Sequence, residues 1–186
     1  MSLQVDQTGA TAHGDVVGRD KIAHVYAASA PLTKVEQLLQ KLQEEVANNE
    51  HAKHTIEALA HFQKRRTHDG VDGLEAKLTA ADRSDEFLSA IEKKEQFAKL
   101  LERWSMYASA QEIFAHLLAK AEFEFTYVIY PQLADISRVK ANELVRDQII
   151  VPVVEECGST VFTLNHSTAM GMIYWLAEQC FVRWHT

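Results

Sequence analysis

Apolar side chains recur at steps of three and four residues along most of this chain of 186 residues. This spacing places them on one face of an α-helix, and that face must be buried against another element. The pattern therefore predicts an all-α fold built as a multi-helix domain. The expected helices lie, in order, within 31–70 and over about 74–81, 87–104, 109–130, 135–156 and 168–184.

The first 30 residues differ from the rest of the chain. They are rich in Gly, Ala, Thr and Val, and glycine and aspartate separate the β-branched residues of 13–22. This composition is typical of short strands and turns, which are marginally stable alone. We expect a small N-terminal β/turn appendage that either covers its own domain or self-associates through Val16, Val17 and Ile22. The expected organisation is an oligomerisation element at 1–30, an amphipathic helix at 31–70 and a helical domain at 71–186.

A heptad seam follows Pro31, a residue that suits the first turn of a helix. Its apolar positions are Leu32, Val35, Leu39, Leu42 and Val46. A seam of this kind lets one helix pack along another. Because Asn49 and Lys53 interrupt it, we expect a helical hairpin or a short oligomerising helix rather than a long coiled coil. The seam and the appendage together predict a homo-oligomer.

The charge balance disfavours nucleic acid as a partner. There are 19 Lys and Arg residues against 26 Asp and Glu residues, a net charge of −7, whereas phosphate binding relies on a basic face. The cluster Lys64–Arg66 suits the C-terminal end of a helix, where positive charge complements the helix dipole. Contact of this cluster with phosphate, in a nucleic-acid-binding accessory protein, is the alternative.

Features that would direct the chain to a membrane or out of the cell are not evident. The N-terminus lacks a basic and apolar leader, and no stretch approaches the roughly 18 apolar residues of a membrane span. Cys157 and Cys180 form no CxxC pair and read as reduced, buried thiols. We expect a cytoplasmic protein without a membrane partner.

The polar residues predict neither a catalytic site nor a bound cofactor. His51, His54, Glu57 and His61 lie on one expected helix, but a single helix supplies no closed metal site, so a solvated polar face is the better interpretation. No Ser/His/Asp set has the arrangement of an activated nucleophile. We therefore expect no enzyme, no cofactor and no metal.

Aromatic residues cluster in the middle of the chain. They are Phe114, Phe123, Phe125, Tyr127 and Tyr130. Stacking on bases would need a cationic groove beside them, so we expect them to pack in the core. An alternative function is a small-molecule or nucleotide sensor with a helical pocket near Trp175 and Tyr127.

The last expected helix carries a recognisable pattern. It reads Gly-Met-x-Tyr-x-Leu-x-x-x-Cys-x-x-Arg-Trp and begins at Gly171. It resembles the closing segment of the C-terminal domains of bacterial ABC-three-component systems, and the resemblance covers most of 71–186. The run Gly-Asp-Val-Val-Gly-Arg-Asp-Lys-Ile at 14–22 is similar to a short element of bacterial conflict and defence proteins.

This resemblance implies a role in anti-phage or anti-plasmid immunity, in which such a domain couples an effector to an ABC ATPase. It favours a non-enzymatic adaptor that oligomerises and binds an ABC ATPase or effector of the same system. Candidate partner-binding residues are Tyr174, Trp175, Arg183 and Trp184, because Trp, Tyr and Arg are enriched at binding hot spots. Tyr174 and Trp184 can equally be core residues.

Overall fold

The computed structural model describes residues 31–66, 70–158, 161 and 163–185. From Leu32 onward the chain forms one compact unit. The β/turn appendage expected at 1–30, with Val16, Val17 and Ile22, lies outside the described residues.

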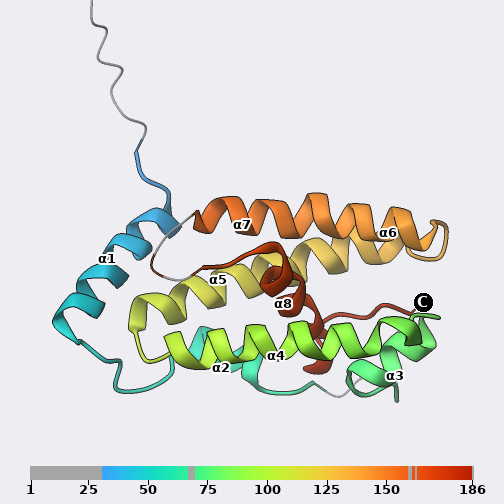
Figure 1. Cartoon of the computed structure of the whole chain (residues 1–186), viewed down its shortest axis with the longest axis horizontal. Helices are drawn as coiled ribbons and strands as arrows, with labels where there is room; N and C mark the ends of the chain where they lie inside the picture. Colours follow the sequence, from blue (N-terminus) through green and yellow to red (C-terminus); the bar gives the residue numbers. More distant parts are fainter. Residues whose placement is uncertain (1–30, 67–69, 159–160, 162, 186) are drawn as a thin grey trace, which may run out of the picture. The chain divides into compact units, whose positions relative to one another are not determined.

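Every regular element of these described ranges is helical, which confirms the predicted all-α fold (Figure 1). The α-helices are α1 (Lys34–Asn48), α2 (Glu57–Gln63), α3 (Gly73–Ala80), α4 (Phe87–Trp104), α5 (Ala108–Glu124), α6 (Arg138–Val145), α7 (Val151–Cys157) and α8 (His166–Glu178). The 3-10 turns η1 (Ser84–Glu86) and η3 (Tyr130–Gln132) and the π-helical segments η2 (Phe125–Ile129) and η4 (Arg146–Ile150) lie between them.

Helix α8 is the central helix, and it contacts α3, α4, α5 and α7 (Figure 1). Nearly all its apolar side chains are buried, as a helix that is hydrophobic on every side requires. Asn165 and Ser167 both have side chains typical of helix caps, and Asn165 is the one that caps α8: its Oδ1 accepts from the Ser167 and Thr168 amides at 2.9 and 3.0 Å. Gly171 lets α8 approach α4 closely, because a Cβ at this position would lie 2.6 Å from the Lys93 carbonyl carbon.

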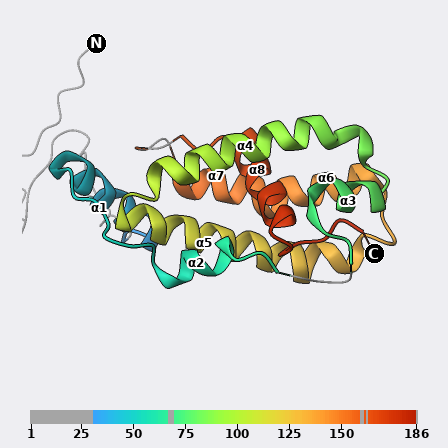
Figure 2. The same cartoon turned by 90° about the horizontal axis from the view of Figure 1, so that it is seen from below.

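Helix α1 packs on α5 within the same chain, and α2 lies along α5 as well (Figure 2). Thr33 and Glu36 form a capping box that starts α1. The inner positions of the predicted seam, Val35, Leu39 and Leu42, are at most 4% exposed in this intramolecular contact. The interruption of the seam at Asn49 coincides with the end of the helix, where Asn49 adopts a left-handed conformation with φ 55°.

Two long helical rods each contain a π-helical segment just before a proline. In the first, η2 continues α5 and is followed by Pro131; in the second, η4 joins α6 to α7 and is followed by Pro152. Proline lacks an amide hydrogen and clashes with the carbonyl four residues earlier, so a widened turn before it relieves the clash. The second rod confirms the helix predicted over 135–156 and ends at Gly158, with φ 57°.

The start of α5 differs from the sequence prediction. The sequence Ser109-Ala110-Gln111-Glu112 has the spacing of a capping box, but the helix begins at Ala108 and has no side-chain cap of its own. Instead, the buried Glu45 of α1 accepts from the Ser109 amide at 3.1 Å and from its hydroxyl at 2.9 Å. The carboxylate comes from a different helix, so local spacing could not reveal it.

Candidate functional site

The helix predicted over 168–184 ends at Glu178, and the segment after it turns back into the fold. Lys77 of α3 is 1% exposed, and its Nζ donates to the carbonyl oxygens of Ala177 at 2.7 Å and Val182 at 3.2 Å. The Arg66 amide donates to the Gln179 carbonyl at 3.0 Å. These bonds satisfy carbonyl groups at and beyond the end of α8, which the helix itself leaves without partners.

Two aromatic side chains fasten the same segment. Phe181 packs on Phe62 with ring centroids 4.9 Å apart, and the Arg66 guanidinium lies 4.0 Å from the centre of the Phe181 ring. Trp184 packs edge-on against Phe125 at 4.9 Å, and the buried Arg83 guanidinium lies 4.5 Å from its ring. Aromatic packing and cation–π contacts thus hold residues 181–184 inside the domain.

The predicted partner-binding residues lie mostly inside the fold. Tyr174, Trp175 and Trp184 are between 4% and 8% exposed. Burial and the nearby Glu86 carboxylate raise the pKa of Tyr174, so its hydroxyl stays protonated and donates to Glu86 at 3.2 Å. Arg183 is half-buried, with its guanidinium 5.3 Å from the centre of the Tyr130 ring.

The two ends of the predicted seam differ from its buried middle. Leu32 is 44% exposed and Val46 is half-buried, whereas the residues between them pack on α5. The buried middle of the seam therefore has an explanation within one chain, whereas the exposed Leu32 does not. The predicted homo-oligomer stays a prediction.

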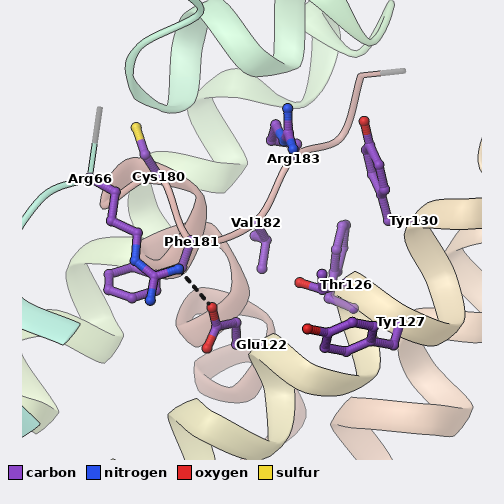
Figure 3. Close-up of a pocket in the computed structure, with 10 residues that line it drawn as sticks. Arg66, Glu122, Thr126, Tyr127, Tyr130, Cys180, Phe181, Val182 and Arg183 are labelled. Atoms are coloured by element: carbon purple, nitrogen blue, oxygen red, sulfur yellow. Dashed lines mark hydrogen bonds and ion pairs between the residues drawn. The ribbon is translucent and has the colours of Figure 1, made fainter. Parts of the chain in front are cut away.

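A cavity of about 190 Å³ opens beside the C-terminal segment (Figure 3). Arg66 and Glu122 form an ion pair at 3.0 Å on one side of it. Tyr127 and Tyr130 lie on the other side, and Arg183 lies level with Tyr130 in the view. The cavity combines aromatic faces with two guanidinium groups and one carboxylate.

An exposed aromatic pair lies next to this cavity. Phe123 is 56% exposed and Tyr127 is 68% exposed, and their ring centroids are 5.0 Å apart. The prediction that the aromatic cluster packs in the core is confirmed for Phe114 and Phe125 but wrong for these two residues. The signal was present in the sequence, because Phe123 of α5 and Tyr127 of η2 are four residues apart on the face of this continuous rod opposite to the buried residues.

In the structure, Arg66 of the basic cluster makes contacts within the fold, and the histidines do not share one helix. Arg66 of the Lys64–Arg66 cluster is engaged by Glu122 and Phe181. His51 and His54 precede α2, so the four polar residues do not share one helix as expected. Among the described residues, no group of three His, Cys, Asp or Glu side chains could hold a metal ion.

The structure also shows the surroundings of the Cys157 thiol and of Trp175, near which a ligand pocket was expected. Burial and the neighbouring Glu156 raise the pKa of the Cys157 thiol to about 12, which keeps it a poor nucleophile. Trp175 packs on Phe97 with ring centroids 6.0 Å apart and does not line the cavity beside Tyr127.

Over the described ranges, none of the helices has the length and apolar character that a membrane crossing needs.

These observations define an all-α domain that fastens its own C-terminal segment and leaves an aromatic pair on its surface. The family model for C-terminal domain 9 of the ABC-three component (ABC-3C) systems matches residues 73–184. The chain belongs to this family, which confirms the resemblance given by the residues from Gly171 to Trp184. No curated protein and no solved structure matches it significantly.

Proposed function

We propose that this chain is a non-enzymatic adaptor of an ABC-3C system and binds another protein component of that system. Membership of the ABC-3C domain family carries the proposal. The engagement of Lys77, Arg66 and Arg83 in fastening the domain's own C-terminal segment supports an architectural rather than a catalytic use of its charged groups.

The proposed contact is an aromatic face made of Phe123, Tyr127, Tyr130 and Arg183. Phe123 and Tyr127 are exposed, and the Arg183 guanidinium lies 5.3 Å from the centre of the Tyr130 ring. Tyr and Arg are enriched among residues that dominate binding energy, and exposed aromatic rings release water when a partner covers them. The proposed occupant is a protein segment that presents an apolar side chain to the two exposed rings.

The test is co-purification with the ABC ATPase and effector components of the same system. The unmodified chain should retain one of them, and the double variant Phe123→Ser/Tyr127→Ser should retain at least about tenfold less, because it removes the apolar contact. Leu88→Ser is the matched control, since Leu88 is an exposed apolar residue (77%) on α4. Circular dichroism checks that each variant folds. Failure of the unmodified chain to bind either component, or equal retention of both variants, would contradict the proposal.

We further propose that the chain is a homo-oligomer assembled through residues 1–30 and the exposed end of the seam at Leu32. The exposed Leu32 and half-buried Val46 support it. Light scattering should give a mass above that of one chain for the full protein and a lower mass for a chain starting at Pro31. Equal monomer masses for the two would contradict it.

The proposed setting is anti-phage or anti-plasmid defence in the cytoplasm, in which the adaptor couples an effector to the ATPase. Two observations support this setting: the resemblance of the C-terminal pattern and the family match.

A further inference from the structure

A second cavity, of about 300 Å³, lies between α4, the α6–η4 rod and α8. Its apolar lining comes from Val145, Ile150 and Met170, and its polar lining includes Ser89, Lys93 and Asn142. A volume near 300 Å³ is at the small end of ligand pockets in proteins, and the mixture of an apolar wall with a few polar groups is typical of them.

Glu86 lies at one end of this cavity, and the hydrogen-bond acceptor sites of its carboxylate are already occupied. Glu86 accepts from Arg83 at 3.1 and 3.4 Å, from Arg138 Nε at 2.9 Å and from the Tyr174 hydroxyl at 3.2 Å. Arg138 also pairs with Asp85 at 2.6 Å. With these lone pairs occupied, Glu86 has no capacity left to bind a cationic ligand.

The remaining polar groups are hydrogen-bond donors. Lys93 Nζ donates to the Ser89 hydroxyl, which directs the hydroxyl proton away from Lys93. Asn142 Oδ1 accepts from Arg83 at 2.8 Å, so its amide nitrogen remains to donate. The charged residues that line the cavity are Lys93 and Glu86, and Glu86 is already paired with Arg83 and Arg138.

We propose that this cavity binds a small monocarboxylate with an apolar tail. The ligand's carboxylate pairs with Lys93 and accepts from the Ser89 hydroxyl, because a charge-assisted hydrogen bond is stronger than a neutral one. Its tail lies on Met170, Val145 and Ile150 and removes apolar surface from water. This inference does not depend on the proposed adaptor function.

The wall formed by η4 supports this assignment. Val145 immediately precedes the π-helical segment and Ile150 is its last residue. Because a π turn joins residues five apart, it brings Val145 and Ile150 to the same side of the rod, whereas an uninterrupted α-helix would place them on different faces. The cavity of Figure 3 is likewise lined by a π segment, through Phe125 and Tyr127 of η2.

The test is a calorimetric titration of the full chain with hexanoate, which measures the affinity and the number of sites. Hexanoate should bind saturably with one site per chain, whereas acetate, which lacks the tail, and hexanamide, which lacks the charge, should bind at least about tenfold more weakly. Absence of saturable hexanoate binding, or equal binding of acetate or hexanamide, would overturn the proposal.

Two variants locate the site. Lys93→Met should abolish hexanoate binding, whereas Lys99→Met, at an exposed lysine of the same helix, should leave it unchanged. Met170→Trp fills the cavity while keeping Lys93, so it should also abolish binding and replaces Lys93→Met if that variant does not fold. Unchanged binding in either cavity variant would place the site elsewhere. The measurement needs no partner protein, so its failure is distinct from failure of the adaptor proposal.

Discussion

Gly171→Ala is expected to lower the free energy of unfolding by about 2 kcal/mol or more. The new methyl group would lie 2.6 Å from the Lys93 carbonyl carbon and closer still to its oxygen. Alanine improves helix propensity by about 1 kcal/mol, but backbone atoms cannot rotate away from the clash. Helices α4 and α8 would therefore have to separate along the largest helix–helix contact of the described unit.

Urea unfolding followed by circular dichroism measures this effect. Leu88→Ala on α4 is the control, because Leu88 is 77% exposed and surface substitutions change stability by no more than about 0.5 kcal/mol. A Gly171→Ala variant as stable as the control would mean that α4 and α8 do not approach as closely as described.

Lys77→Met is expected to destabilise the domain by about 2–4 kcal/mol. Methionine fills nearly the same volume but cannot donate a hydrogen bond. The carbonyl oxygens of Ala177 and Val182 would lose the ammonium donor that lies 2.7 and 3.2 Å away. The segment from Cys180 to Trp184 should then detach before the rest of the domain unfolds.

Amide hydrogen exchange locates this loss. Residues 180–184 should exchange faster in Lys77→Met, while the interior of α5 keeps its protection until global unfolding. Lys99→Met is the matched control, since Lys99 is exposed on α4. Unchanged exchange in 180–184 would show that the ammonium group does not hold this segment.

Most helices could be predicted from the sequence because their signals are local. The apolar spacing of 135–156 and the glycine after Cys157 placed the second rod, and Asn165 marked the start of α8. Each of these signals lies within a few residues of the structure it predicts, so no knowledge of the fold is needed.

The candidate sites were predicted less well because they depend on which face of a helix meets which neighbour. Tyr174 and Trp184 carry the chemistry of a binding surface, but the fold buries both. Phe123 and Tyr127 carry the chemistry of a core, but no described element covers them. Residue type alone gives an average preference for burial, and individual residues depart from it.

The sequence by itself determined that the described part of this chain is helical, where most of its helices begin, and that its C-terminal pattern resembles that of ABC-3C domains. Only the tertiary structure decided that Lys77 and Arg83 are buried and that Glu45 caps a helix 64 residues away. The physical reason is the range of the interactions. Helix periodicity and caps act over one or two turns, whereas a buried charge is stable only where distant segments supply its partners.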